Sequence, residues 1–531
     1  MRGTFFFFLL LGMSSSATTT EAEFRSSLKN WSSQELAGQL LFVGMRNIEQ
    51  VQKIQPAGVI LFAWNMRSVE KVQALTWKLS RISKKLKLPL MIATDHEGGE
   101  VIRIRRGVTN FPDAAVIAAS NDTKLSERIG FLTGQELRAL GLNTNLAPVL
   151  DLGNARSFLR NRVWGSDPEK VARLTSSYIH GLERAGVLSV AKHFPGHGST
   201  TVDSHYNLPV SYKRLSQLWS ADLKPFREAV KNNVPALMTA HVELPLVERV
   251  PASFSKKMLS TLLREKMGYE GVIITDDLEM GAAKGSSGAS LSALSLQALK
   301  AGSDLVMLVW NQQEQLKVRD RLAKAIESGE LKRLDVYEKI VRTWRAKQRF
   351  EINAESTSDI AQVGKRETRA LVSKVIRAAV LWRAGNETKV LSPFRSKKNQ
   401  AWRVWLPSHS TAKMWKKLRP RDQAELIPKA SGGAFLGELK MALAKKQPIV
   451  LVTPPRASLS SEVFDQILSV LNTANDTESR SSLLWVHQGS DPIPLSAVNK
   501  SDLKFGIMTL SSASLRSFHA FTNYLKDNRL F

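Results

Sequence analysis

The 531-residue sequence contains no cysteine. This absence excludes disulfide bonds, thiolate nucleophiles and Cys-ligated zinc. It is compatible with an oxidising compartment but does not indicate one. After the first fifteen residues the sequence also lacks an apolar run long enough to span a bilayer. The remaining composition, 43% hydrophobic and 23% charged, is typical of a globular protein.

The N-terminus has the pattern of an export signal. Arg2 precedes a ten-residue apolar core, Thr4–Met13, and small residues follow as far as Ala17. We therefore predict that residues 1–17 are a signal peptide and that the protein is periplasmic or secreted. The alternatives are a membrane-anchoring terminus, or a frayed terminus on a cytoplasmic protein. No cysteine follows the apolar core, so a lipid-anchored lipoprotein is not expected.

Acidic residues are scarce relative to basic ones. The chain has 75 Lys and Arg against 48 Asp and Glu, a net charge of +27. Residues 361–531 hold 27 of the basic and 12 of the acidic residues, a net +15. Such a field attracts polyanions, although a solvated basic face is the alternative interpretation. Because no nucleic-acid-binding motif is present, we expect no nucleic acid partner and propose an anionic cell-envelope polymer instead.

Short apolar runs alternate with helical stretches through the first 310 residues. This alternation is typical of a parallel sheet buried on both faces. Eight such units predict a (β/α)8 TIM-type barrel, and an open doubly wound sheet is the alternative. The eight runs are Gln39–Met45, Ala57–Ala63, Leu88–Asp95, Thr144–Asp151, Val187–Phe194, Ala236–Val242, Val272–Asp277 and Asp304–Val309.

A second domain is predicted after the barrel. We place the catalytic barrel at residues 24–350 and a polar linker at 351–365. Residues 366–531 then form a smaller, basic α/β domain. Its strand-like runs are Ala378–Trp382, Ala401–Trp405, Pro448–Val452 and Leu483–Val486, and Ser461–Asn472 has a helical pattern.

The fifth run ends in a histidine-rich segment, AKHFPGHGSTTVDSHYNLP at 191–209. A metal site is not expected, because Pro195 and the glycines break any helix that could present His193 and His197 together. We predict no metal and no cofactor. Instead, Asp203 can orient the ring of His205 and leave its other nitrogen free for proton exchange. The alternative interpretation is an Asp–His pair on the protein surface that has no catalytic role.

Two adjacent carboxylates end the seventh run, GVIITDDLEM. A carboxylate at the end of a barrel strand can attack an anomeric carbon and form a covalent glycosyl-enzyme. An aspartate in this position can also cap the following helix. Asp276 and Asp277 can therefore divide these two roles between them.

Further polar residues end other predicted strands. Asp95 ends the third run and precedes Arg103, Arg162 follows the fourth, and His241 lies at the end of the sixth. Carboxylate and guanidinium groups form good hydrogen bonds with sugar hydroxyls. Each residue is weak evidence alone, but active sites of such barrels lie at this end of the strands.

The chain closely resembles the β-N-acetylglucosaminidase branch of glycoside hydrolase family 3. The resemblance covers roughly residues 30–350, and the specific part is KHFPGHG…DSH, a histidine dyad that other branches lack. The other matching segments are ILFAWN at 60–65, TDHEGGEVIR at 94–103, LAPVLDL at 146–152, RVWGSDP at 162–168, MTAHV at 238–242, PASFS at 251–255 and LREKMGYEGVIITDDLEMGA at 263–282.

The resemblance implies Asp276 as nucleophile and His205 as acid/base, assisted by Asp203. It also implies that the N-acetylglucosamine ring is held by Asp95, Arg103, Arg162, Lys192 and His193. Two positions depart from the branch: Glu100 and Trp64 each stand where an arginine is common, and both could alter substrate fit.

Three functions follow as hypotheses. The first is retaining hydrolysis of terminal β-linked N-acetylglucosamine from peptidoglycan fragments or related N-acetylhexosaminides. The second is a phosphorylase, because a histidine acid/base repels phosphate less than a carboxylate does. The third is a non-catalytic cell-wall-binding protein, against which the intact Asp203, His205 and Asp276 argue.

Overall fold

The structure is a computed structural model of the whole chain. It describes residues 19–153, 157–159, 162–198, 200, 202–284, 288–352 and 360–378 and six later strands. The predicted signal peptide and the predicted helix at 461–472 lie outside the described residues. Among the residues that are described, no helix combines the length and apolar character needed to cross a membrane.

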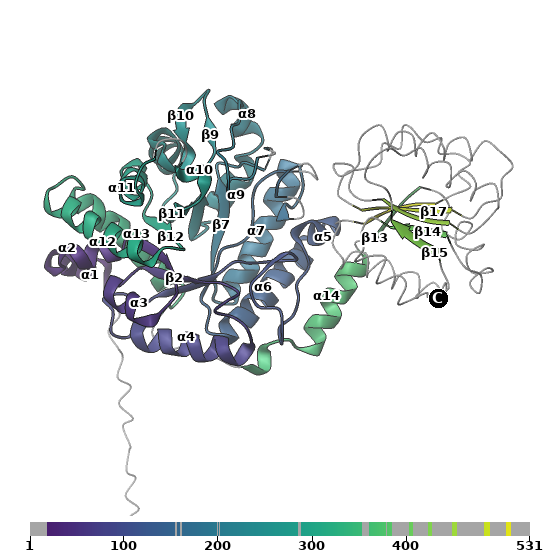
Figure 1. Cartoon of the computed structure of the whole chain (residues 1–531), viewed down its shortest axis with the longest axis horizontal. Helices are drawn as coiled ribbons and strands as arrows, with labels where there is room; N and C mark the ends of the chain where they lie inside the picture. The colour runs from purple at the N-terminus through teal and green to yellow at the C-terminus, as the bar shows by residue number, and fades with distance from the viewer. Residues whose placement is uncertain are drawn as a thin grey trace, which may run out of the picture.

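Eight parallel strands close into a barrel, which confirms the predicted fold class and excludes the open sheet (Figure 1). The order around the barrel is β1-β12-β11-β8-β7-β6-β3-β2. Each strand falls inside one of the eight apolar runs. Their bounds are β1 Leu41–Gly44, β2 Gly58–Leu61, β3 Met91–Thr94, β6 Thr144–Asn145, β7 Leu188–Phe194, β8 Ala236–Thr239, β11 Val272–Asp277 and β12 Leu305–Leu308.

Helices surround the barrel and cover its outer face (Figure 1). Their starts are fixed locally. For example, the Asp167 side chain accepts hydrogen bonds from two backbone N–H groups of the first turn of α7, and Pro168 occupies its first position. The helices are α1 Glu21–Ser27, α2 Ser33–Gly38, α3 Ile48–Ile54, α4 Val69–Ser83, α5 Ala114–Ala119, α6 Thr123–Ala139, α7 Pro168–Arg184, α8 Leu215–Ser220, α9 Lys224–Lys231, α10 Gly281–Lys284, α11 Leu291–Ala301, α12 Gln312–Glu327, α13 Arg333–Arg349 and α14 Arg366–Ala378, with the π-helix η4 at Lys257–Lys266.

The strands bury both faces, because alternate side chains point in opposite directions. Phe42, Ile60 and Met307 belong to a cluster that fills the barrel interior. Their neighbours Leu41 and Leu308 belong to the larger cluster between barrel and helices. This double burial explains why the sequence shows continuous apolar runs instead of alternating ones.

Two short hairpins extend from the barrel. The first pairs β4 (His96–Gly98) with β5 (Val101–Ile102), directly after β3. The second pairs β9 (Glu243–Leu244) with β10 (Glu248–Pro251), after β8. The first hairpin continues the chain from Asp95 and so places additional charged residues beside the barrel opening.

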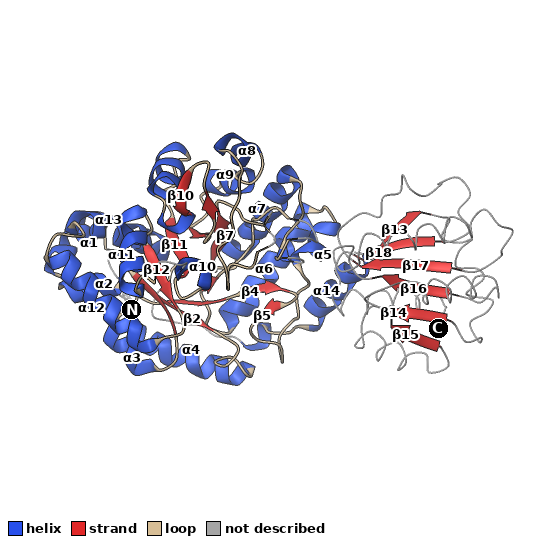
Figure 2. Ribbon diagram, turned by 45° about the horizontal axis from the view of Figure 1, so that its top comes forward, coloured by secondary structure: helices blue, strands red, loops and turns tan. Residues whose placement is uncertain are grey.

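A separate six-stranded sheet follows α14 (Figure 2). Its order is β13-β18-β17-β16-β14-β15, and only β13 pairs antiparallel. Four strands overlap the predicted runs, whereas β15 and β18 were not predicted. The domain boundaries themselves stay predictions. The strands are β13 Val380–Ala384, β14 Arg403–Leu406, β15 Gln423–Leu426, β16 Ile449–Thr453, β17 Leu483–Gln488 and β18 Gly506–Leu510.

A buried carboxylate connects the barrel to two of its covering helices. Asp304, directly before β12, is fully buried and forms ion pairs with Arg264 of η4 and Arg342 of α13. Its Oδ2 also accepts a hydrogen bond from the Ile273 N–H at 2.8 Å. Burial raises the pKa of Asp304, but the cationic neighbours outweigh this and hold the pKa below its ordinary value. The carboxylate is therefore ionised at neutral pH.

We predict that Asp304→Asn lowers the free energy of unfolding by about 3–5 kcal/mol, because it leaves two partly buried guanidinium groups without a counter-charge. The wild-type contribution of Asp304 should be present at neutral pH and be lost as pH falls through its lowered pKa. Urea unfolding of both proteins measures the difference. Glu330→Gln, which breaks exposed pairs with Lys300 and Arg321, is the matched control and should cost less than about 1 kcal/mol. Equal losses in the two variants would contradict the prediction.

Candidate active site

The carboxyl ends of the barrel strands surround a cavity of about 450 Å³. This is the end of the barrel at which polar residues were predicted to gather. Titratable side chains from five segments of the chain line it. They are Asp95, Glu97, Arg103, Arg162, Lys192, His193, His197, His205, Asp276 and Asp277.

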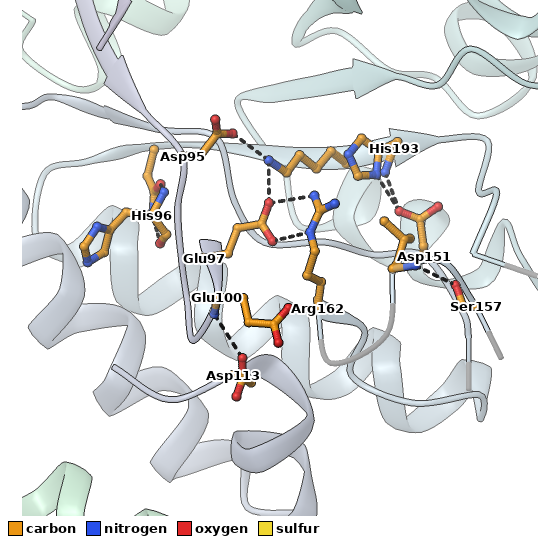
Figure 3. A network of polar contacts seen from close by, with 12 residues as sticks. Asp95, His96, Glu97, Glu100, Asp113, Asp151, Ser157, Arg162 and His193 are labelled. Atoms are coloured by element: carbon orange, nitrogen blue, oxygen red, sulfur yellow. Dashed lines mark hydrogen bonds and ion pairs between the residues drawn. The ribbon is translucent and has the colours of Figure 1, made fainter. Parts of the chain in front are cut away.

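Charged residues among those that line the cavity form an alternating network of ion pairs (Figure 3). Nζ of Lys192 lies 2.9 Å from Oδ1 of Asp95 and 2.7 Å from Oε1 of Glu97. Arg162 binds both oxygens of Glu97, through Nε at 2.8 Å and Nη2 at 2.9 Å. Arg103 binds the second oxygen of Asp95 at 2.8 Å. Four predicted sugar-binding residues are thus brought together, and Glu97 connects them.

Burial and charge oppose each other in this network. Burial raises the pKa of Asp95 and of Glu97, but the adjacent cations outweigh it and hold both pKa values below the ordinary range. Burial lowers the pKa of Lys192, but the two carboxylates outweigh this and raise it. All three groups are therefore charged at neutral pH, and they can present fixed donors and acceptors to sugar hydroxyls.

Asp151 fixes two histidine rings beside this network. Its side chain is fully buried and lies 2.7 Å from Nδ1 of His193 and 3.1 Å from Nδ1 of His197. The same carboxylate accepts hydrogen bonds from the backbone N–H groups of both residues, at 3.0 and 2.7 Å. Because the pKa of Asp151 is held well below its ordinary value, its ionised carboxylate accepts Nδ1–H of each ring and fixes the orientation of both.

Asp151, His193 and His197 are also close enough together to hold a metal ion. One potential ligand atom from each of them lies within 4.8 Å of the other two. The carboxylate of Asp151 already accepts four hydrogen bonds, two on each oxygen. This internally saturated arrangement fits an orienting role for Asp151 better than metal coordination.

Asp276 and Asp277 lie in different electrostatic surroundings at the end of β11. Burial raises the pKa of Asp276, but the His193 and His241 rings, the Asp277 N–H and Lys192 outweigh it and lower the pKa below its ordinary value. Burial raises the pKa of Asp277 to about 7, and no cation offsets it. Asp277 Oδ1 accepts the Glu279 N–H at 3.1 Å. Asp276 is therefore the ionised carboxylate, and Asp277 closes the following turn.

A backbone hydrogen bond holds the segment that carries His205 against the turn that follows Asp276. Nδ1 of His205 lies 2.7 Å from Oδ1 of Asp203, which also accepts the His205 N–H at 3.0 Å. The His205 carbonyl accepts the Gly281 N–H at 3.0 Å. Any side chain on Gly281 would collide with the Tyr206 carbonyl, at 2.2 Å from an added Cβ. Glycine therefore permits this approach, which brings His205 to the cavity that Asp276 lines.

Not all of the predicted site residues line the cavity. His205 lines the cavity with a side chain that is 60% exposed, whereas Asp203 supports it from outside the lining. His241 is buried and does not line the cavity; its Nε2 lies 3.2 Å from the Asp277 carbonyl. Of the two departures from the branch pattern, Trp64 lines the cavity and the exposed Glu100 does not.

Sequence reasoning missed three members of the site: Glu97, Asp151 and His197. Glu97 follows Asp95 by two positions, and alternation along an extended chain places both on one side. Asp151 ends the fourth apolar run as Asp95 ends the third. Both signals were present in the sequence, but the histidine partners of Asp151 are more than forty residues away.

We predict that Asp151→Asn lowers the free energy of unfolding by about 2–3 kcal/mol, because an amide nitrogen cannot accept the N–H groups that now meet a carboxylate oxygen. The imidazole Nδ1–H signals of His193 and His197 in proton NMR should shift or disappear. Asp167→Asn, at the exposed start of α7, is the control and should change stability by less than about 0.5 kcal/mol, since asparagine caps a helix equally well. Unchanged imidazole signals in Asp151→Asn would refute the orienting role.

The chain is similar to known glycosidases. Residues 34–346 match the sequence profile of the glycosyl hydrolase family 3 N-terminal domain. A β-hexosaminidase from Alkalilimnicola ehrlichii is 41% identical over 258 residues, 47% of this chain and 73% of that protein. A family 3 β-N-acetylglucosaminidase from Paenibacillus sp. has a similar structure, with 27% identity, a TM-score of 0.75, and coverage of 94% of this chain and 97% of the other.

NagZ from Neisseria gonorrhoeae, whose structure contains N-trifluoroacetyl-D-glucosamine, is 28% identical with a TM-score of 0.52. The similarity covers 63% of this chain and 96% of that one. The family match spans more than half of this chain and includes every residue that lines the cavity. The chain therefore belongs to glycosyl hydrolase family 3 and is a glycoside hydrolase similar to β-hexosaminidases.

Proposed function

We propose that this enzyme releases terminal β-linked N-acetylglucosamine from peptidoglycan fragments by a retaining mechanism. The observation that carries the proposal is that an ionised Asp276 and the Asp203-supported His205 line one cavity. The relatives named as β-hexosaminidase and β-N-acetylglucosaminidase support the sugar. Peptidoglycan fragments as the source of that sugar remain part of the proposal.

In the first step, the Asp276 carboxylate attacks the anomeric carbon of the bound sugar. The bond from that carbon to the leaving oxygen breaks, and the oxygen takes a proton from Nε2 of His205. Because Asp203 binds the Nδ1 side of the ring, the Nε2 side is available to the substrate. In the second step, His205 removes a proton from water, which attacks the anomeric carbon and releases Asp276. Two displacements retain the β configuration.

Asp276→Asn should reduce turnover of an aryl β-N-acetylglucosaminide to background, because an amide is not a competent nucleophile. His205→Ala should lower kcat by about 10²–10⁴-fold on a substrate with a poor leaving group. His180→Ala, which removes a similarly exposed histidine beside Glu127, is the matched control. Proton NMR of the first product should detect the β anomer. Full activity in either site variant, or an α product, would reject the mechanism.

Phosphate is a second candidate acceptor, because the acid/base group is a histidine and not a carboxylate. Phosphate attacking the glycosyl-enzyme would yield the sugar 1-phosphate in place of the free sugar. Comparing products with and without phosphate in the same assay separates the two reactions. We expect free N-acetylglucosamine as the product with and without phosphate. Formation of the sugar 1-phosphate in its place would show that the enzyme is a phosphorylase.

We also propose that residues 1–17 direct export and that the basic region 366–531 holds the enzyme near an anionic cell-envelope polymer. The net charge of the C-terminal region supports this. Binding to isolated peptidoglycan carrying its anionic polymers should decrease steeply as salt rises from 50 to about 500 mM, because electrostatic attraction is screened. Binding that is absent or independent of salt would rule out the tether.

A further inference from the structure

The outer side of α4 carries a concentration of positive charge. Residues 71–94 include six Lys and Arg residues and no Asp or Glu. Four of the cations, Lys71, Lys78, Arg81 and Lys85, are exposed. Their spacings of seven, three and four residues place them on one side of the helix and of the turn that follows it. The opposite side of α4 is buried against the barrel.

These four cations have no carboxylate partner within the part of the chain that the structure describes. On α1 and α12, by contrast, Glu21 pairs with Arg25 and Glu314 pairs with Lys317 along the same helix. On α4 the cations lie three and four residues from one another, and like charges at these spacings destabilise a helix. An anion from outside the chain would relieve this repulsion.

Trp77 lies among these cations, and its side chain is 54% exposed. Cζ of Arg81 lies 4.9 Å from the ring centroid, so a cation–π contact holds the two side chains together. An indole has an apolar body and a polar N–H group, and it is favoured where an apolar phase meets water. We call Lys71, Trp77, Lys78, Arg81 and Lys85 the α4 face.

No described element covers the α4 face. In both views of the fold, α4 forms the lower edge of the barrel (Figures 1 and 2). Its inner side contacts the end of α6, where Thr76 Oγ1 donates a hydrogen bond to the Leu140 carbonyl at 2.7 Å. The cations and the indole are therefore available to a partner outside the chain.

Shape and charge together favour one class of anionic partner. A single-stranded polyanion is typically held in a positively charged groove, with its bases stacked on free aromatic rings. The α4 face is instead the convex side of one helix, and Arg81 covers one face of the Trp77 ring. A bilayer that contains anionic lipids fits such a surface. Its phosphates attract Lys and Arg, and its interface accommodates an indole.

We propose that the α4 face binds the surface of an anionic phospholipid bilayer. Lys71, Lys78, Arg81 and Lys85 pair with lipid phosphates, and the Trp77 indole lies at the level of the headgroups. This function goes beyond glycoside hydrolysis, and it involves a different surface and a different partner from the C-terminal region.

The position of α4 also determines how the barrel lies on the bilayer. The helix follows the carboxyl end of β2 and precedes the start of β3, so it runs from the cavity end of the barrel to the opposite end. A barrel bound through α4 therefore lies on its side, and the cavity stays open to soluble substrates. Neutralising the α4 face should accordingly leave turnover of a small soluble substrate unchanged.

The test measures partitioning of the full chain onto vesicles of phosphatidylcholine, alone or mixed with an equal part of phosphatidylglycerol, at about 0.1 M salt. We expect the wild type to prefer the anionic vesicles. Lys71→Gln, Lys78→Gln, Arg81→Gln and Lys85→Gln together should lower partitioning onto these vesicles by about 10²–10³-fold, since each cation near the surface contributes about fivefold.

A matched control removes the same amount of charge from other surfaces. Lys124, Lys231, Lys256 and Lys324 are exposed and have no carboxylate partner among the described residues, but they lie on or beside four different helices. Replacing all four with Gln should change partitioning by less than about twofold, because salt screens charges that are more than about 10 Å from the bilayer. Equal losses in the two quadruple variants would mean that only net charge matters, and would overturn the proposal.

Trp77→Ala distinguishes a bilayer from a soluble polyanion. It should lower partitioning onto the anionic vesicles by about tenfold, because it removes apolar surface from the interface, and should leave binding of polyphosphate unchanged. Trp310→Ala is the control, since it removes an indole that is 49% exposed but lines the cavity. If Trp77→Ala has no effect and the quadruple α4 variant loses polyphosphate binding as strongly as vesicle binding, the partner is a soluble polyanion and the proposal fails.

Thermal unfolding shows whether each variant is folded. If the quadruple α4 variant does not fold, the pairs Lys71→Gln with Lys78→Gln and Arg81→Gln with Lys85→Gln are measured separately. Each pair should lower partitioning onto anionic vesicles by about 20–30-fold. Wild-type binding that does not distinguish the two kinds of vesicle, or folded α4 variants that partition as the wild type does, would overturn the proposal.

Discussion

The ammonium group of Lys192 is the interaction on which the site depends. It is almost fully buried, and an unpaired cation there would be expelled or neutralised. Its contacts with Asp95 and Glu97 bind the end of β7 to the end of β3 and to the β4 strand, which are distant in sequence. Since each carboxylate is also bound by an arginine, the charges compensate one another locally. Removing any one of them leaves its neighbours with an incompletely compensated charge.

This compensation explains how the cavity can be highly charged and yet ordered. The network residues keep their charges because each has a partner of opposite sign, so their donors and acceptors are fixed before a sugar arrives. The same principle separates the two aspartates of β11. Asp276 faces histidines and Lys192 and is ionised, whereas Asp277 is buried without a cation and its pKa rises to about 7. Two adjacent, chemically identical groups therefore differ in how readily they ionise.

The sequence predicted the barrel because eight strands are buried on both faces and leave continuous apolar runs. It also predicted most of the titratable residues that line the cavity, because polar side chains at strand ends share one rim of a barrel. It could not predict pairings between distant segments. The orientation of His193 and His197 depends on Asp151, and Arg162 depends on Glu97 in a hairpin. His241 has the same sequence signature as the lining residues, yet its ring is directed to the Asp277 carbonyl.

The contacts among the rings of Phe62, Trp64 and Trp310 could not be predicted either, because these residues come from opposite ends of the barrel domain and meet only when β12 pairs with β1. These rings also contact the charged network. Phe62 stacks on Trp64 and has the guanidinium of Arg103 5.3 Å from its centroid, while Arg103 binds Asp95 at 2.8 Å. A continuous series of contacts therefore connects Trp310 to the network that surrounds Lys192. Because residues in one connected network do not contribute additively, the effect of a substitution at position 64 is expected to depend on the residues of the charged network.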